Sequence, residues 1–496
     1  MTDDPRQRAL YSAEQVRRID RAAIEGHAIA GRTLMQRAAA AAFALLRRRW
    51  PRAQRLLLLV GHGNNGGDAL LLGALACEAG LSVLAVALGA QSQGDAASAR
   101  ATYLAAGGTL WIATDDTELP AADVIVDGLF GSGLSRAVDG VAARLIAQAN
   151  AAAGGVLALD VPSGLDADCG VPRGVALHAD ATICFVAWKQ GLFTGAAADH
   201  CGARELALLE LPSSVHAGFA AQAMLLDVGV FAALPARRAD SNKGSFGHVL
   251  VVGGDAGYGG AVQLAAGAAL RSGAGLVSVA TRSAHVAALN AALPEAMARG
   301  VETAEDFDAL LARASVLALG PGLGGSEWSQ HLLARALASA RPQVVDADAL
   351  NLLARAPRAL GAASVITPHP GEAARLLGCP VGSVQADRFA AVRALAQRHD
   401  CVAVLKGSGS LVAAPDGRIA VCRWGNAGMA SGGTGDVLTG VIAALMAQGL
   451  AAWDAACVGV AAHARAGDLA AREGMRGLVA RDLWPCLRRV LNGLDA

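Results

Sequence analysis

A glycine-rich segment near the C-terminus ends in a single carboxylate. Residues 425–436 have the sequence GNAGMASGGTGD, and residues 437–446 that follow are apolar with helical spacing. Backbone N–H groups that converge at a helix N-terminus form an anion site. Asp436 would there meet a phosphate and an acceptor hydroxyl together. The simpler interpretation is that Asp436 caps the helix, because Asp before an apolar run is a common helix start.

A second glycine-rich turn, KGSGS at 406–410, precedes two short apolar runs on either side of Asp416-Gly417. Such a pattern predicts a β-hairpin. The sequence contains no GxxxxGK[ST] motif and is therefore not that of a P-loop enzyme. Phosphates must instead be held by other glycine-rich turns and by a helix N-terminus.

Three polar clusters in the first half each follow an apolar segment, namely NNGGD at 64–68, DGLFGSG at 127–133 and DVPSGLD at 160–166. Ligands of open α/β sheets bind at the carboxyl ends of strands. Amide, carboxylate and hydroxyl oxygens suit a hard cation, so Asn65, Asp127 and Ser163 could form a metal site. Each residue alone is a common turn or cap residue, but caps alone do not explain three such clusters.

The same region also suggests a dehydrogenase. Gly61, Gly63 and Gly66 satisfy GxGxxG after an apolar segment, a pattern typical of nicotinamide- and flavin-binding enzymes. The ribose-binding carboxylate should then end the next strand, about 20 residues on. That strand ends at Leu88-Gly89 instead, which disfavours a dehydrogenase.

The elements that position these clusters alternate between strand and helix. Residues 11–49 are predicted to be helical, with Ser12 and Gln15 in a capping box, and the next helix is predicted at 69–79. Fully apolar strands in repeated βα units predict parallel sheets covered on both faces. The irregular segment 209–239 predicts a boundary between domains at 1–215 and 226–496. The predicted strands are 55–60, 81–88, 109–112, 124–126, 156–159, 248–254, 276–280, 316–319, 343–346, 364–367 and 401–405.

Composition narrows the class of protein. The 496 residues are 54% hydrophobic and 17% charged with zero net charge, as expected for two well-packed domains and not for a disordered chain. The sequence has no Lys/Arg block beyond Arg47-Arg48-Arg49, which is expected to solvate a helix end, so nucleic acid is not an expected partner. The 9 cysteines form no CxxC pair, which favours reduced thiols in a cytoplasm and no zinc site. We expect no secretory signal, because the N-terminal segment is charged, and no membrane span, because 437–453 is too short.

The motifs of the first half, GNNGGD, DGLFGSGLSR and LDVPSGLDAD, together resemble the epimerase domain of the NAD(P)H-hydrate repair enzymes over residues 11–213. The resemblance implies an α/β fold, a Rossmann-like three-layer αβα domain, and a potassium ion bound by Asn65, Asp127 and Ser163. Asp160 would contact the nicotinamide end and perform acid/base work. His62 and Ala69 depart from the usual Pro and Gly, which affects the expected loop shape. The residues implied to bind hydrated NAD(P)H are Asn64, Asn65, Gly66, Gly67, Asp68, Gly131, Ser132, Gly133, Leu134, Ser135, Arg136, Ala137 and Asp160.

The second half resembles the ADP-dependent NAD(P)H-hydrate dehydratases, with a ribokinase-like αβα fold over 226–496. The matching motifs are NKGSFGHVLVVGG, GYGGA, GPGLG, VDADALN, TPHPGE, KGSGS and the loop at 425–436, with Asn242 where the family often has His. The residues implied to bind the hydrated substrate are Ala261, Gly322, Gly324, His369 and Asp436. Those implied to bind ADP are Lys406, Gly407, Ser408, Gly409, Ser410 and Gly435.

The implied chemistry is consistent with these residues. Hydroxide is a poor leaving group, whereas phosphate leaves readily, so phosphoryl transfer from ADP would activate the ring hydroxyl. Asp436 would act as the base, and the amides of 432–435 would stabilise the migrating phosphoryl charge. Three roles stay open: His369 lines the site or fixes a turn, Glu372 orients magnesium or caps a helix, and Lys243 binds phosphate or is merely solvated.

The leading hypothesis is a bifunctional repair enzyme. The first domain would interconvert R and S NADHX and NADPHX, and the second would dehydrate the S epimer with ADP, giving AMP and phosphate. Potassium, magnesium, a homo-oligomer and a cytoplasmic location are expected, without a nucleic-acid or membrane partner. One alternative is a ribokinase-type small-molecule kinase fused to a nucleotide-binding domain, which would leave a stable phosphorylated product. Another is a non-catalytic nucleotide or sterol-carrier-like binding protein, for which Asp160 and Asp436 would be dispensable.

Overall fold

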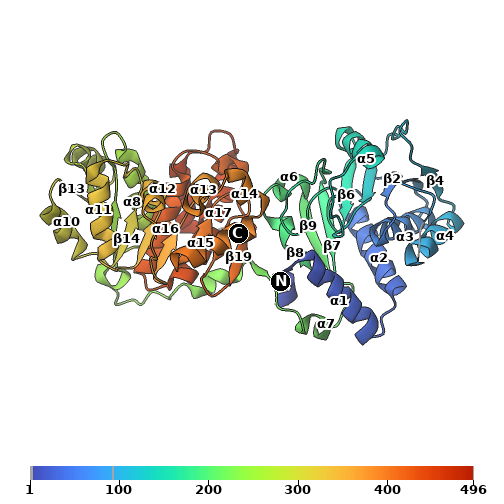
Figure 1. Ribbon diagram of the computed structural model, residues 1–496, viewed down its shortest axis with the longest axis horizontal. Coiled ribbons are helices and arrows are strands. Elements are labelled where there is room, and N and C mark those ends of the chain that lie inside the picture. Colours follow the sequence, from blue (N-terminus) through green and yellow to red (C-terminus); the bar gives the residue numbers. More distant parts are fainter. Residues whose placement is uncertain (1–3, 92–93, 495–496) are drawn as a thin grey trace. The chain divides into compact units, whose positions relative to one another are not determined.

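The computed structural model describes residues 4–91 and 94–494 and divides into two compact units, Met1–Met224 and Leu225–Ala496 (Figure 1). Each unit is built around its own mainly parallel sheet with helices on both faces, so the predicted α/β class is confirmed. No helix in the described part of the chain is long and apolar enough to cross a membrane.

The sheet of the first unit has seven parallel strands in the order β4-β3-β2-β5-β6-β7-β9. Leu58 of β2 lies opposite Ala85 of β3 on one side and Val126 of β5 on the other. The strands are β2 (Arg55–Val60), β3 (Ser82–Ala87), β4 (Thr109–Ile112), β5 (Val124–Gly128), β6 (Gly155–Leu159), β7 (Ala181–Phe185) and β9 (Ala203–Ala207).

Both faces of this sheet are buried. Leu56 and Leu58 pack in one core with helices α1, α2 and α3, while Leu57 and Leu59 pack in a second core with α5. Alternate side chains of a strand point to opposite faces, so the apolar run of β2 fills both cores and the unit has three layers. The helices are α1 (Ala13–Gly26), α2 (Gly31–Arg49), α3 (Asn64–Glu78), α4 (Gly94–Ala105), α5 (Gly140–Ala151), α6 (Ala197–His200) and α7 (Ser213–Ala217).

A short ribbon lies apart from this sheet. Strand β1 (Ala9–Tyr11) pairs in parallel with β8 (Trp188–Lys189) and antiparallel with β10 (Ala223–Leu226). The ribbon matters for the site because it carries Lys189, and no strand was predicted in any of its three segments.

The second unit has strands in the order β13-β12-β11-β14-β15-β16-β17-β18-β19, parallel except for the last two steps. The predicted hairpin around Asp416-Gly417 is confirmed by the antiparallel pairing of β18 with β19, whereas the edge strand β13 was not predicted. The strands are β11 (His248–Val252), β12 (Leu276–Thr281), β13 (Met297–Gly300), β14 (Val316–Leu319), β15 (Gln343–Val345), β16 (Ser364–Ile366), β17 (Val402–Leu405), β18 (Leu411–Ala413) and β19 (Ile419–Cys422).

One face of this second sheet packs against α8, α16, α17 and α18 in a large core that includes Val249 and Val251. The alternate residues Leu250 and Val252 are also fully buried, so the opposite face is covered too. The helices are α8 (Gly259–Arg271), α9 (Val286–Ala292), α10 (Ala304–Leu311), α11 (Glu327–Ala338), α12 (Ala347–Arg355), α13 (Pro370–Leu377), α14 (Val381–Ala386), α15 (Arg388–His399), α16 (Thr434–Ala447), α17 (Ala452–Ala470) and α18 (Leu483–Val490).

Three local predictions have definite outcomes. The capping box of Ser12 and Gln15 is confirmed at the start of α1. The start of α3 was predicted too late, because residues 64–68 already form its first turns. The interpretation of Asp436 as a helix cap was wrong: Gly433, with φ of 90°, is the N-cap of α16 and Asp436 is the third helical residue.

Candidate active sites

A cavity of about 550 Å³ opens at the carboxyl edge of the first sheet. Three predicted ligand residues do not line it: Gly66, Gly67 and Ala137. A Cβ atom on Gly66 would lie 2.2 Å from the Gly61 carbonyl oxygen, and one on Gly67 would lie 2.7 Å from Met35 Sδ. These two glycines therefore allow α3 to pack closely. The predicted residues that do line the cavity are Asn64, Asn65, Asp68, Gly131, Ser132, Gly133, Leu134, Ser135, Arg136 and Asp160.

Asp160 follows β6 with φ of 65°, a left-handed conformation that Asp tolerates better than most residues. Its Oδ1 atom forms an ion pair with the Nζ of Lys189, and its Oδ2 accepts a hydrogen bond from the Ser132 amide at 3.2 Å. Lys189 is 1% exposed and also donates to the Phe185 carbonyl at 2.9 Å. Burial works against its charge, but Asp160, Cys184 and Asp20 together outweigh that effect and raise the pKa of Lys189. A buried cation thus holds the Asp160 carboxylate at the cavity wall.

Three further carboxyl groups line the same cavity: Asp20 from α1, Asp68 from α3 and the exposed Asp95 from α4. Burial raises the pKa of Asp20 to about 6, with Lys189 opposing the shift and Asp160 adding to it. Burial also raises the pKa of Asp68 well above its usual range, and the charges of Asp160 and Asp20 add to the effect. Burial therefore favours the protonated forms of Asp20 and Asp68.

Asn65, Asp127 and Ser163 meet at the ends of neighbouring elements, as expected from the strand pattern. The Ser163 hydroxyl donates to Asp127 Oδ1 at 2.6 Å and the Ser163 amide donates to Oδ2 at 2.7 Å. Asn65 Nδ2 donates to the carbonyls of Phe130 and Leu159, both at 3.1 Å. Asn65 Oδ1 is buried without a hydrogen-bond partner among the residues described, so this oxygen is available to coordinate a cation. Buried oxygens of this kind fit a hard cation.

The first turn of α3 supplies donors to this cavity. Its N-cap is Gly63, so no side chain caps the first amides of the helix. Uncapped amides and the positive end of the helix dipole attract phosphate. The NNGGD cluster thus forms the start of α3, whereas the sequence pattern predicted the helix only from residue 69.

The same device recurs in the second unit at α16. Its N-cap Gly433 has no side chain to accept from the first amides, and Asp436 lies in the first turn. Burial raises the pKa of Asp436 to about 7; Asp346 adds to the shift and Lys406 opposes it. No hydrogen bond or ion pair engages the Asp436 carboxylate within residues 4–91 and 94–494. A free carboxylate with such a pKa can take up a proton near neutral pH.

Lys406, directly after β17, is the cation of this site. Its Nζ donates to Asp346 Oδ1 at 2.6 Å and lies 3.9 Å from Glu372 Oε2. Thr439 Oγ1 donates to the other Asp346 oxygen at 2.8 Å. A Cβ atom on Gly435 would lie only 3.2 Å from Lys406 Nζ, so a residue without a side chain lets the lysine approach the start of α16.

The loop before α16 is held by side chains outside it. Asp468 of α17 accepts from the Gly425 amide at 3.1 Å and from Asn426 Nδ2 at 2.9 Å. His463 Nε2 lies 2.9 Å from the Thr434 carbonyl, and burial lowers the pKa of this histidine to about 4, which keeps it neutral. These contacts fix the glycine-rich loop in place, as a preorganised anion site requires.

The turn at 406–410 depends on glycine conformations and on a buried arginine. Gly407 and Gly409 have φ of 132° and 61°. Arg388, at the start of α15, is 1% exposed and donates to the carbonyls of Leu405 and Lys406 at 3.3 and 3.2 Å. The arginine thus fixes the end of β17, from which the turn projects.

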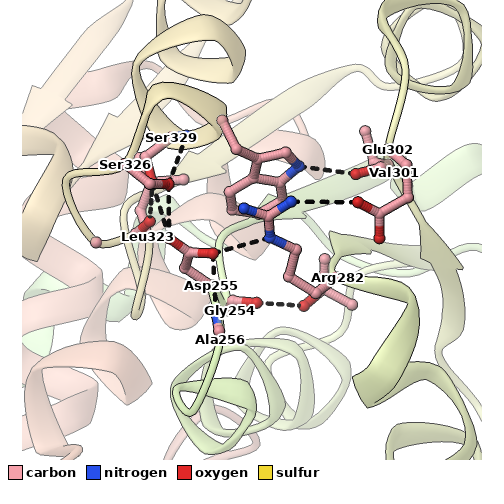
Figure 2. A network of polar contacts seen from close by, with 12 residues as sticks. Gly254, Asp255, Ala256, Arg282, Val301, Glu302, Leu323, Ser326 and Ser329 are labelled. Atoms are coloured by element: carbon pink, nitrogen blue, oxygen red, sulfur yellow. Dashed lines mark hydrogen bonds and ion pairs between the residues drawn. The ribbon is translucent and has the colours of Figure 1, made fainter.

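The GPGLG loop after β14 rests on a polar network (Figure 2). Asp255 accepts from Ser326 Oγ at 2.7 Å and from Arg282 Nε at 2.8 Å. A Cβ atom on Gly324 would lie 3.1 Å from Asp255 Oδ2, so the loop lies directly on this carboxylate. Gly322, with φ of 56°, packs in the same way against Tyr258 and Ala261. The network thus positions Gly324 and, through the Asp255 amide that donates to the Gly322 carbonyl at 2.8 Å, Gly322 as well, while Ala261 packs against Gly322.

His369 and Glu372 together cap α13. The Gly371 amide donates to His369 Nδ1 at 3.0 Å, and the His369 amide donates to Glu372 Oε2 at 2.8 Å. Burial raises the pKa of Glu372 to about 7, with Lys406 opposing. Capping thus explains both residues structurally, while the half-exposed His369 ring is still accessible to a ligand. Lys243 is exposed, in accord with a solvated lysine.

Sequence reasoning missed Lys189, Asp20, Asp346, Arg388 and His463. One signal was available: the chain has three lysines among 42 basic residues. Two of the three, the buried Lys189 and the partly buried Lys406, are the cations of the two sites. Arg and Lys are not interchangeable where a compact point charge must fit.

Comparison with known proteins connects both units to named families. Residues 249–489 match the family model described as NAD(P)H-hydrate dehydratase, and residues 31–191 match the one described as YjeF-related protein N-terminus. A bifunctional NAD(P)H-hydrate repair enzyme of Coxiella burnetii is 46% identical over 97% of this chain and 99% of its own. One from Escherichia coli is 42% identical over 97% and 94%. A solved ribokinase-like superfamily protein from Enterococcus faecalis has a TM-score of 0.52 at 28% identity, covering 56% of this chain and 98% of its own.

Proposed function

The chain belongs to the bifunctional NAD(P)H-hydrate repair enzymes, and on that premise we propose how its two units divide the reaction. The first unit epimerises R and S NAD(P)HX. The second dehydrates the S epimer with ADP, yielding NAD(P)H, AMP and phosphate. The observation that carries the proposal is the free Asp436 carboxylate, with a pKa near 7, at an uncapped helix start beside Lys406.

In the second unit Asp436 accepts the proton of the ring hydroxyl while the hydroxyl oxygen attacks the terminal phosphorus of ADP. The bond from that phosphorus to AMP breaks. The phosphate formed on the ring then leaves with the former hydroxyl oxygen and the bonding electron pair, and the neighbouring ring carbon loses a proton to water, which restores the ring double bond of NAD(P)H. Amides at the start of α16 and the Lys406 ammonium stabilise the migrating charge. The turn at 406–410 and Gly435 hold ADP, and Ala261, Gly322, Gly324 and His369 line the side of the hydrated ring.

In the first unit Asp160 moves the proton. Inverting a hydroxyl-bearing carbon requires the hydroxyl to leave and return, or the ring to open and close, and each route needs a proton transfer. Lys189 and the Ser132 amide fix the Asp160 carboxylate for that transfer. The amides of α3 and the 131–136 loop bind the phosphates and sugars of the substrate.

Two metal ions complete the proposal. Asn65, Asp127 and Ser163 hold potassium, whose charge offsets the burial of Asp127, a carboxyl with a pKa raised to about 6 by burial. Magnesium enters with the phosphates of ADP, because it is commonly held by substrate phosphates and one or two carboxylates. The described residues contain no group of three His, Cys, Asp or Glu side chains arranged as metal ligands. We further propose that the enzyme acts in the cytoplasm as a homo-oligomer.

The test is to mix the purified protein with NADHX and ADP and follow the absorbance of reduced nicotinamide. Full recovery from a mixture of both epimers supports repair by both units. Recovery limited to the S epimer removes the epimerase role. A stable phosphorylated product would support a kinase, and no reaction with ADP or ATP would exclude the dehydratase role.

A further inference from the structure

A cavity of about 700 Å³ in the C-terminal unit includes Gly324, which we place beside the hydrated ring, and extends to residues that have no assigned ligand. It lies at the same edge of the sheet as Asp436, because its walls come from segments that follow β11, β14, β15 and β16. The residues lining it are Tyr258, Gly324, Gly325, Asp348, Asn351, Leu352, Ala354, Arg355 and Arg375.

This arginine cavity, named for Arg355 and Arg375, borders the dehydration centre. The Gly324 amide donates to Asp348 Oδ2 at 2.9 Å. The charge of Asp348 adds to the rise in the pKa of Asp436 that burial and Asp346 cause. Burial and the charge of Lys406 lower the pKa of His369 most, and the charge of Arg375 lowers it further. Charged groups on the cavity wall therefore act on the proposed base Asp436 and on His369, which lines the hydrated ring.

The two arginines differ in how they are held. Arg375 Nε donates to Asn351 Oδ1 at 2.8 Å, and Asn351 Nδ2 donates to Asp348 Oδ1 at 3.3 Å. This chain orients the guanidinium and leaves its two terminal nitrogens for a ligand. Both arginines are exposed, and neither forms an ion pair with a carboxylate within residues 4–91 and 94–494. Paired guanidinium groups without a carboxylate partner favour phosphate.

The order of the strands separates this cavity from the site proposed for ADP. The ADP turn follows β17, whereas Gly324 follows β14 and helix α12 with Arg355 follows β15. The substrate is a dinucleotide and has phosphates far from its hydrated ring. Those phosphates must leave the centre on a side that ADP does not occupy.

We propose that Arg355 and Arg375 bind a phosphate of the dinucleotide substrate during dehydration. The proposal rests on the proposed function of the second unit. The phosphate is either in the pyrophosphate, which NADHX and NADPHX share, or on the adenosine ribose, which only NADPHX carries. The exposed Tyr258 ring at the cavity wall offers a face on which a base can stack.

The experiment measures steady-state dehydration of S-NADHX and S-NADPHX by the full chain at saturating ADP. Variants Arg355→Gln and Arg375→Gln are compared with Arg358→Gln, an exposed arginine outside the cavity wall. We expect KM for the dinucleotide to rise about 10-fold in each cavity variant, with kcat within about 2-fold and KM for ADP unchanged. Arg358→Gln should match the parent protein.

The outcomes separate the two phosphates. A rise in KM for both substrates assigns the pyrophosphate, and a rise for S-NADPHX alone assigns the ribose phosphate. Unchanged KM for both substrates, or a rise in KM for ADP instead, overturns the proposal. Arg355→Gln keeps the test independent of the Asn351 contact that Arg375 makes. If the parent protein dehydrates neither substrate, the proposed function of the second unit is wrong, and the inference about the two arginines fails with it.

Discussion

The two domains place similar groups at the carboxyl edge of a parallel sheet, yet they use their lysines differently. Each has an uncapped helix start, α3 or α16, and a lysine beside carboxylates. Lys189 pairs directly with Asp160, the proposed catalytic carboxylate, whereas Lys406 pairs with Asp346 and leaves Asp436 free. One arrangement holds a carboxyl group in place through an ion pair, and the other provides a base that titrates near neutral pH.

Replacing the two site lysines one at a time should have the largest effect on the rates of epimerisation and dehydration. We expect Lys189→Met to lower epimerisation at least about 100-fold with dehydration of S-NADHX unchanged, because Asp160 loses its cation. Lys406→Met should instead lower dehydration and leave epimerisation unchanged. The exposed Lys243 provides the matched control, and Lys243→Met should retain both rates. Separate assays of each reaction decide the matter, and a variant that loses both rates would show that the domains are coupled.

Removing the unpartnered oxygen of the first domain should have an intermediate effect. Asn65→Ala deletes the amide oxygen that we propose as a potassium ligand, so epimerisation should fall about 10-fold and no longer respond to potassium. The parent protein should lose epimerase activity, and melt at a lower temperature, when sodium replaces potassium. Equal epimerisation rates and equal melting temperatures in both salts would contradict a potassium site at Asn65.

A smaller, graded effect is expected from pH. Asp436 must be ionised to accept a proton, and its pKa is about 7. The kcat of dehydration should therefore rise about 10-fold per pH unit below that value and level off above it. A pH series with S-NADHX and saturating ADP measures this. A rate that falls as pH rises through 7 would contradict a base role, since the carboxylate population only grows in that direction.

The sequence predicted where the polar clusters lie better than it predicted which distant side chains pair with them. Apolar strands followed by polar residues placed Asn65, Asp127 and Ser163 together, because carboxyl ends of parallel strands share one edge. Lys189 escaped notice because its partner Asp160 is 29 residues away and its strand β8 has only two residues. No periodic pattern exists in so short a strand.

Two boundaries failed for a physical reason. The NNGGD segment has poor intrinsic helix propensity, yet it is helical because Gly66 packs tightly against Gly61. Asp436 resembled a cap because local sequence cannot reveal that Gly433, in a left-handed conformation, already begins the helix. Tertiary packing decided both cases.

The central claim is that Asp160 and Asp436 each serve one reaction. Its most direct test starts from pure R-NADHX with ADP and follows the two epimers by chromatography and NADH by absorbance. With Asp436→Asn, R should still convert to S while NADH formation is lost. With Asp160→Asn, R should persist at its uncatalysed rate, whereas added S-NADHX should still yield NADH. Loss of both reactions in either variant, or retention of dehydration in Asp436→Asn, would contradict the account.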